Sequence, residues 1–303
     1  MPTLAEVPSG PARRVVYLGT PDVAVPPLQA LVDSGVDVAL VITRVDKRRG
    51  RGAALSPSPV KAAALQLGLP VSHDLSDVLS VGADLGVVVA YGRIIPVDVL
   101  VRLPMINVHF SLLPRWRGAA PVERALLAGD AETGVCIMRV EEGLDTGVVY
   151  DRVTLSIRPD HTLTTLRNEL VQAALPPLVR AVTQGCTAGE PQLGEPTHAA
   201  KISPSELQIS FTMTARHIAA LTTLETAWFQ LAGKRVRVVR AEVDETPAAT
   251  GVAPGETLGN DARGVRVACG EGVIVLVTVQ PEGKTPMAAT AWANGARLPA
   301  SLA

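Results

Sequence analysis

The stretch RVVYLGTPDVAVPPLQALVDSGVDVALVIT, residues 14–43, decides the fold class of this 303-residue chain. It opens with a short apolar run fit for a buried strand, which breaks at a Gly-Thr-Pro turn. A helix is expected over 22–34, because Asp22 suits the positive end of a helix dipole. A second apolar run covers 36–43. A strand, a helix and a strand within about thirty residues predict one βαβ unit with a right-handed crossover.

The same alternation continues toward the middle of the chain, which predicts an open, mostly parallel sheet with helices on both faces. Forty-seven per cent of the residues are hydrophobic but only 3% are aromatic, so the core must be aliphatic, as suits buried parallel strands. Further strands are expected at 69–72, 85–90, 105–110 and 134–140, and further helices at 59–67, 96–102, 119–128 and 161–183.

The second part of the chain has another character. Residues 185–206 are rich in glycine and proline, which predicts a linker with few packed contacts. Short β-rich segments separated by turn residues follow at 227–231, 235–243, 264–268 and 273–279, and they predict a small antiparallel barrel. We therefore expect a disordered tail (1–12), an α/β domain (13–184), a linker (185–206) and a β-barrel domain (207–303).

The composition excludes several classes of protein. The formal net charge of −1 means that nucleic acid would have to be bound by a local basic patch. The three cysteines have no CxxC or metal-ligand spacing, which predicts buried thiols, no metal site and a reducing compartment. The longest apolar run is too short for a bilayer and the first residues do not resemble a signal peptide. A cytoplasmic protein is expected, and a monomer, since no strip of apolar residues calls for a partner.

Asn107, His109 and Asp145 are the candidate reactive groups. Asn107 and His109 are two apart near the end of a predicted strand, so they share a face at the sheet edge where ligands bind. An amide donor beside an imidazole suits acyl transfer. Asp145 lies between glycines in the loop 141–147, so its carboxylate could reach His109 and fix its tautomer. Taken alone, each signal is more typical of structure than of catalysis: Asn107 would cap a turn, His109 would be a satisfied polar residue, and the Asp145 loop would be a surface turn.

A basic loop follows the second predicted strand. Residues 44–61 hold six basic side chains against one acidic one. Such a run is often only a solvated surface. A pliable cationic loop near the expected pocket mouth also suits nucleic-acid phosphates, whose attraction depends on salt.

Several long motifs, in order along the chain, resemble the methionyl-tRNA formyltransferase family. The central one is INVHFSLLPRWRGAAP (106–121), followed by AGDAETGVCIM (128–138) and EEGLDTG (141–147). VVYLGTPDVAVPPL (15–28) and VVVAYGRIIP (87–96) are similar to the same family. The match is close over residues 14–150 and thinner afterwards.

This resemblance implies a Rossmann-like formyltransferase domain followed by a small OB-like β-barrel that binds tRNA. It implies that formyl passes from 10-formyltetrahydrofolate, without a metal, to the α-amino group of methionyl initiator tRNA. Asn107, His109 and Asp145 match the family's catalytic positions. The folate-binding stretches correspond to Ser111, Leu112, Leu113 and Pro114 and to Tyr91, Gly92, Arg93, Ile94 and Ile95. Arg51 is the best candidate tRNA contact, with Lys47, Arg48 and Arg49 beside it.

Several other functions are compatible with parts of these motifs. Sugar-nucleotide and glycinamide ribonucleotide formyltransferases, and a formyltetrahydrofolate hydrolase, share the chemistry but use another acceptor. The PRWRGAAP run, the Gly-Arg-Gly loop and the second domain favour tRNA. A nicotinamide-dependent dehydrogenase is disfavoured because the first turn, Gly19 to Ala24, lacks the G-x-G-x-x-G pattern. The three candidate catalytic residues argue against a purely RNA-binding module.

Overall fold

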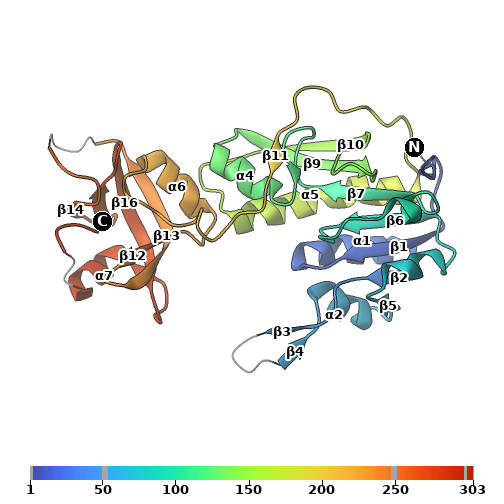
Figure 1. Ribbon diagram of the computed structural model, residues 1–303, viewed down its shortest axis with the longest axis horizontal. Helices are drawn as coiled ribbons and strands as arrows, with labels where there is room; N and C mark the ends of the chain where they lie inside the picture. Colours follow the sequence, from blue (N-terminus) through green and yellow to red (C-terminus); the bar gives the residue numbers. More distant parts are fainter. Residues whose placement is uncertain (1–2, 50–53, 247–250, 297–298, 303) are drawn as a thin grey trace. The chain divides into compact units, whose positions relative to one another are not determined.

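The computed structural model describes residues 3–49, 54–246, 251–296 and 299–302 (Figure 1). Its contacts divide the chain into two compact units. The N-terminal unit comprises Met1–Val122, Glu132–Ser156 and Leu166–Ala200. The C-terminal unit comprises Glu123–Ala131, Ile157–Thr165 and Lys201–Ala303.

The N-terminal unit is built on a 7-stranded sheet with the order β10-β9-β7-β6-β1-β2-β5. The pairings β5-β2, β2-β1, β1-β6 and β6-β7 are parallel, whereas β9 pairs antiparallel with both β7 and β10. The predicted mostly parallel sheet is therefore confirmed. The strands are β1 (Arg14–Gly19), β2 (Asp37–Ile42), β5 (Val71–Ser72), β6 (Leu85–Val89), β7 (Met105–His109), β9 (Glu132–Arg139) and β10 (Val149–Ser156).

The order of the strands reverses at β1, which lies between β2 and β6. In open α/β sheets, ligands bind beyond the carboxyl ends of the strands at such a switch point. The chain leaves β1 at Gly19 and β6 at Val89, and the next strand on that side, β7, ends at His109. The fold thus brings the candidate reactive residues of β7 close to the expected ligand edge.

Helices complete the N-terminal unit because their apolar faces pack on the sheet. In α1, for example, Leu28 and Leu31 are fully buried. Ser58 caps α2 by accepting a hydrogen bond from the backbone N–H of Lys61 at 3.0 Å. The elements are the 3₁₀ turns η1 (Asp22–Ala24) and η2 (Leu75–Leu79), α1 (Val25–Asp33), α2 (Pro59–Gln66), α3 (Val97–Leu100) and most of α5 (Leu163–Thr183), whereas most of α4 (Pro121–Ala128) belongs to the C-terminal unit. Two short pairs, β3 (Lys47–Arg49) with β4 (Ala54–Ser56) and β8 (Arg117–Gly118) with β11 (His198–Ala199), lie outside the main sheet.

The expected disordered tail is wrong for residues 3–12, the part that the structure describes. These residues form no helix or strand, but their backbone is tied to the N-terminal unit. Ala5 N–H donates to the Leu100 carbonyl at 3.0 Å, and Ala12 N–H donates to the Val182 carbonyl at 2.9 Å. The sequence pattern missed this because such bonds use the backbone, which leaves no periodicity in the side chains.

The expected linker is also corrected in part. Residues 185–200 belong to the N-terminal unit, and only the rest of 185–206 falls in the C-terminal one. Glu190 bridges Val149, and β11 pairs with β8. Glycine and proline here mark irregular backbone, and that backbone is packed.

The C-terminal unit is an antiparallel sheet of the order β12-β13-β16-β15-β14, with β17 paired to β16. The predicted β-rich second domain is confirmed. Its core contains Phe229. The centroid of this ring lies 5.3 Å from that of Phe211 and 6.2 Å from that of Trp292, and both pairs are arranged edge to face. The elements are β12 (Trp228–Leu231), β13 (Lys234–Asp244), β14 (Thr257–Asn260), β15 (Val265–Ala268), β16 (Val273–Pro281), β17 (Met287–Ala288), α6 (Ala215–Thr223) and α7 (Ala289–Ala296).

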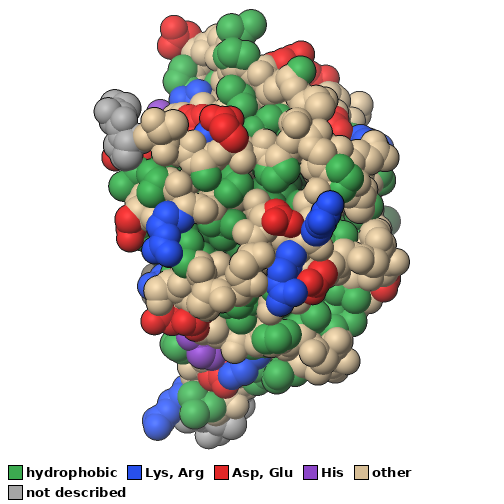
Figure 2. Space-filling model, turned by 90° about the vertical axis from the view of Figure 1, so that its right-hand side faces the viewer, with side chains coloured by type: hydrophobic (Ala, Val, Ile, Leu, Met, Phe, Trp, Pro, Cys, Tyr) green, Lys and Arg blue, Asp and Glu red, His purple; other side chains and the backbone are tan. Residues whose placement is uncertain are grey.

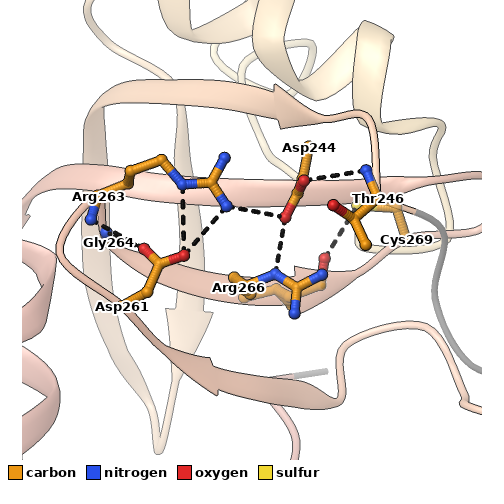
Figure 3. Close-up of polar contacts among 8 residues, drawn as sticks. Asp244, Thr246, Asp261, Arg263, Gly264, Arg266 and Cys269 are labelled. Carbon is orange, nitrogen blue, oxygen red and sulfur yellow. Dashed lines mark hydrogen bonds and ion pairs between the residues drawn. The ribbon is translucent and has the colours of Figure 1, made fainter.

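The buried carboxylate of Asp244, at the end of β13, binds two arginines at and just before β15 (Figure 3). Its oxygens accept hydrogen bonds from Thr246 N–H at 3.0 Å, from Arg266 Nε at 2.7 Å and from Arg263 Nη2 at 3.3 Å. Asp261 holds the same Arg263 from the other side, at 3.0 Å. The backbone donor of Thr246, followed by the Arg266 side chain, lowers the pKa of Asp244 to about 2.

Candidate active site

Strand β7 presents Asn107 and His109 at its carboxyl end. The strand runs without a bulge between β6 and β9, so residues two apart point to the same face. His109 is 5% exposed, while Asn107 is half-buried. The two side chains therefore project together at the ligand edge, as the spacing predicts.

The structure brings together the imidazole of His109, at the end of β7, and the carboxylate of Asp145, in the loop between β9 and β10. His109 Nδ1 lies 3.6 Å from Asp145 Oδ2. The same oxygen accepts a hydrogen bond from Gly118 N–H at 2.8 Å. His109 Nε2 lies 2.9 Å from the carbonyl oxygen of Trp116. Both ring nitrogens thus face oxygen acceptors, one within hydrogen-bond distance and one slightly beyond it.

The two loops that hold this pair have unusual backbone conformations. Asp145 and Trp116 have φ values of 53° and 60°, a region that side chains other than glycine seldom occupy. At Gly147 a Cβ would lie 2.1 Å from the carbonyl oxygen of Arg139, so only glycine lets the loop pass so close to β9. Such strained residues cluster at functional sites, where the surrounding structure holds them.

A cysteine lies across from His109, but it is not a second reactive group. Cys136 in β9 pairs with His109 in β7. It is fully buried, and burial raises the pKa of its thiol. A neutral buried thiol is inert as a nucleophile.

The first predicted folate stretch, Ser111 to Pro114, follows β7, and two of its four side chains are buried. Ser111 is fully buried and donates its hydroxyl to the Arg115 carbonyl at 2.6 Å. Leu113 packs with the buried core of β9 and β10, and Leu112 lies against Gly134. Ser111 and Leu113 are therefore core residues, whereas Leu112 and Pro114 are half-buried.

The second predicted folate stretch is divided between core and surface. Tyr91 and Ile95 are buried in the core, and the Tyr91 hydroxyl has no hydrogen-bond partner among the described residues. Gly92, Arg93 and Ile94 are exposed, with Ile94 at 82%.

The basic loop forms the hairpin of β3 and β4. Lys47 pairs with Ser56 and Arg48 with Leu55 across the hairpin, and both basic residues are exposed. The backbone of Arg49 belongs to β3, and the position of its side chain is outside the described part. Arg51, the favoured tRNA contact, lies outside the described residues.

The base of this hairpin is fastened by residues that the sequence analysis did not single out. Lys61, counted among the loop's charges, pairs with Asp46 at 2.8 Å to both carboxylate oxygens. Arg44 donates from Nη2 to the carbonyl of Gly92. This bond links the start of the hairpin to the exposed turn after β6.

Two further residues near the reactive pair were missed. Gln192 bonds to the backbone of Asp145, and Thr197 accepts a hydrogen bond from Trp116 N–H at 2.8 Å. Both lie in the segment expected to be a linker. No local pattern could have found them, since their partners are more than 40 residues away in sequence.

Charge over the molecule is mixed. Figure 2 shows one face on which Lys and Arg side chains are interspersed with Asp and Glu. This agrees with the net charge of −1 and leaves local groups such as the hairpin to attract an anion.

The described part of the chain contains no cluster of three or more His, Cys, Asp or Glu side chains placed to hold a metal ion. None of its helices combines the length and the apolar character that a bilayer span requires.

Comparison with known proteins identifies both parts of the chain. The family model described as formyl transferase matches residues 13–182, and the model described as formyl transferase, C-terminal domain, matches residues 201–297. A protein of Ruegeria pomeroyi named methionyl-tRNA formyltransferase is 41% identical over 302 residues, which cover 94% of this chain and 98% of that protein.

Solved structures show the same fold at low sequence identity. An N-formyltransferase of Helicobacter canadensis, in complex with folinic acid and dTDP-3-aminofucose, matches with a TM-score of 0.65 and 14% identity, over 89% of this chain and 99% of that one. HypX of Aquifex aeolicus, in complex with tetrahydrofolic acid, matches with a TM-score of 0.62 and 15% identity, over 93% of this chain. This chain spans about half of HypX, 47% of its length. With both formyl transferase models and a near full-length relative at 41% identity, the chain belongs to the methionyl-tRNA formyltransferase family.

Proposed function

We propose that this enzyme transfers the formyl group of 10-formyltetrahydrofolate to the α-amino group of methionyl initiator tRNA, giving N-formylmethionyl-tRNA for translation initiation. The observation that carries the proposal is the pair His109 and Asp145, 3.6 Å apart, at the end of the strand that also holds Asn107. Family membership supports the acceptor. The folate compounds bound to the two similar structures support the class of donor.

The three residues have separate tasks in the transfer. The α-amine is protonated below a pKa of roughly 7.7–8.0 and must lose a proton to attack. A bond forms between its nitrogen and the formyl carbon, the bond from that carbon to the folate nitrogen breaks, and negative charge grows on the formyl oxygen. Asn107 and His109 donate hydrogen bonds to that oxygen. Asp145 orients the ring and accepts the amine proton, directly or through water, and the folate nitrogen takes up a proton as it leaves.

The hydrogen bond from His109 to Trp116 bears on this role. Nε2 lies 2.9 Å from the Trp116 carbonyl, so the formyl oxygen has to share or replace that acceptor. Catalytic hydrogen bonds commonly tighten only when the substrate is bound. The neighbouring Asp145 retains its Gly118 contact and can hold the ring during this exchange.

The exposed turn after β6 fits a folate. Arg93 and Ile94 are exposed beside the switch point of the sheet, where they offer a cation and an apolar side chain, while the carbonyl of the neighbouring Gly92 is held by Arg44. We assign Tyr91 and Ile95 to the support of this turn, and Ser111 to Pro114 to the wall on the other side.

We assign the phosphates of the tRNA to the hairpin of β3 and β4. Lys47 and Arg48 are exposed there, whereas the charge of Lys61 is already paired with Asp46. Arg49 and Arg51 complete the proposed set. We further propose a cytoplasmic monomer: Cys136, Cys186 and Cys269 are buried free thiols, as expected in a reducing compartment.

One assay tests the whole proposal. The enzyme is incubated with 10-formyltetrahydrofolate and charged initiator tRNA, and in parallel with an amino-sugar nucleotide, with glycinamide ribonucleotide and with water alone. We expect formyl-methionine from the tRNA reaction and little product from the others. Transfer to another acceptor, or hydrolysis of the donor alone, would overturn the proposed acceptor.

A further inference from the structure

The segment 190–199 crosses the two loops that hold the candidate catalytic pair. Glu190 exchanges backbone hydrogen bonds with Val149, just after the Asp145 loop, at 2.8 and 2.9 Å. Thr197 accepts from Trp116 N–H at 2.8 Å, in the loop that receives the His109 hydrogen bond. A stretch with the composition of a linker therefore touches both halves of the site.

Gln192 makes the closest connection between those halves. Its Nε2 donates to the carbonyl oxygens of Asp145 and Gly147, each at 2.8 Å. Its Oε1 accepts from Nε and Nη2 of Arg117, at 2.9 and 2.7 Å. An amide offers two N–H donors and two lone pairs, so its whole capacity is used. Because a guanidinium only donates and a carbonyl only accepts, the amide fits in one orientation.

These bonds act on the residue that faces His109. Asp145 has a φ of 53°, which persists only where the surroundings hold it. Gln192 holds its carbonyl, and Gly118 N–H holds its carboxylate at 2.8 Å. Gly118 follows Arg117, whose side chain is also bound by Gln192. The distance between Asp145 and His109 thus depends on a frame that passes through this one amide.

We propose that Gln192 is a positioning residue for formyl transfer, which locks the Asp145 loop against the loop of Arg117 and so sets the carboxylate beside His109. The inference rests on the proposed function. Gln192 touches neither the imidazole nor the carboxylate, so it acts through Asp145 and does not itself move a proton.

Two substitutions distinguish the bonds that Gln192 donates to Asp145 and Gly147 from the bonds that it accepts from Arg117. Gln192→Ala removes all four bonds. Gln192→Glu keeps an acceptor for Arg117 but replaces the donor with an oxygen that faces the Asp145 and Gly147 carbonyls. We expect both variants to lower kcat for formylation roughly 10- to 100-fold, as small misplacements of reacting groups do, with KM values for tRNA and folate within about threefold. Leu193→Ala is the matched control, since Leu193 is next in sequence and 83% exposed.

A second measurement guards against simple misfolding. In an Asp145→Asn background, Gln192→Ala should cause little further loss of kcat, because groups that act as one unit are not additive. An active Gln192→Glu variant, or a loss that multiplies with that of Asp145→Asn, would overturn the inference. If the unmodified enzyme itself fails to formylate methionyl-tRNA, the proposed function is what fails.

Discussion

Asp145 in the N-terminal unit and Asp244 in the C-terminal unit are both carboxylates with little exposure, at 13% and 3% of their side chains. Asp244 is surrounded by donors: one backbone N–H and two guanidinium groups. Asp145 accepts one backbone N–H and faces an imidazole at 3.6 Å. The carboxylate of Asp244 is thus surrounded by hydrogen-bond donors, whereas that of Asp145 has one backbone donor and a neighbouring ring.

The difference shows what distinguishes a structural carboxylate from a reactive one. The donors around Asp244 hold its pKa at about 2, so it stays ionised and bound. Asp145 has one backbone donor and an imidazole beside it, a setting that suits the proton acceptor we propose it to be. Its backbone has a left-handed φ of 53°, whereas Asp244 is the last residue of strand β13. The comparison predicts that changes at the first site damage turnover and changes at the second damage stability.

The largest effect is expected at the partner of Asp145. His109→Ala should lower kcat roughly 10²–10⁴-fold, a loss of about 3–5 kcal/mol in barrier lowering, because a donor to the formyl oxygen and a proton carrier are removed together. Single-turnover formylation of methionyl-tRNA measures it, with circular dichroism to check the fold. Near-normal turnover of His109→Ala would contradict the catalytic role assigned to His109 and Asp145.

A smaller effect, on stability, is expected at the other carboxylate. Asp244→Asn should lower the unfolding free energy at pH 7 by about 1–3 kcal/mol, since Arg263 and Arg266 lose the negative charge of their acceptor and face an amide in its place. The folded pKa of about 2 is below the usual value of roughly 3.9, so this stabilisation is present above the usual value and is lost as pH falls through about 2.

Urea unfolding of both proteins between pH 7 and pH 2 measures that prediction. The gap between them should narrow on acidification, while turnover at pH 7 stays unchanged where the variant is folded. A gap that widens toward acid would show that Asp244 does not supply the stabilisation assigned to it.

The smallest effect concerns the hairpin charges that we assign to the tRNA, compared with a charge that is already paired. Removing Arg48 and Arg51 together should flatten the dependence of log K for tRNA on log salt, by about one unit for each phosphate that is no longer bound. Lys61→Ala is the control, because Lys61 already pairs with Asp46. Filter binding at several salt concentrations measures both. If the slope of log K against log salt were the same for the unmodified enzyme, the Arg48/Arg51 double variant and Lys61→Ala, the hairpin would not bind the tRNA phosphates.

The sequence predicted those helices and strands in which apolar side chains recur at a regular spacing. The βαβ start, the parallel sheet and the β-rich second domain follow from apolar runs, and Asn107 and His109 follow from their spacing on a strand. Residues 3–12 and 185–200 were misjudged because backbone bonds hold them. Gln192 was missed for a related reason: its partners, Asp145 and Arg117, are brought to it only by the fold.

The account depends most on His109 and Asp145 acting as one unit. A double-mutant cycle on kcat, with Asp145→Asn, His109→Ala and the pair combined, tests this directly. We expect the double variant to be faster than the product of the two single losses predicts, because His109→Ala has already removed the ring that the carboxylate orients and only its task as proton acceptor is left to lose. Losses that multiply, with the double variant slower than either single variant by the product of their effects, would contradict it.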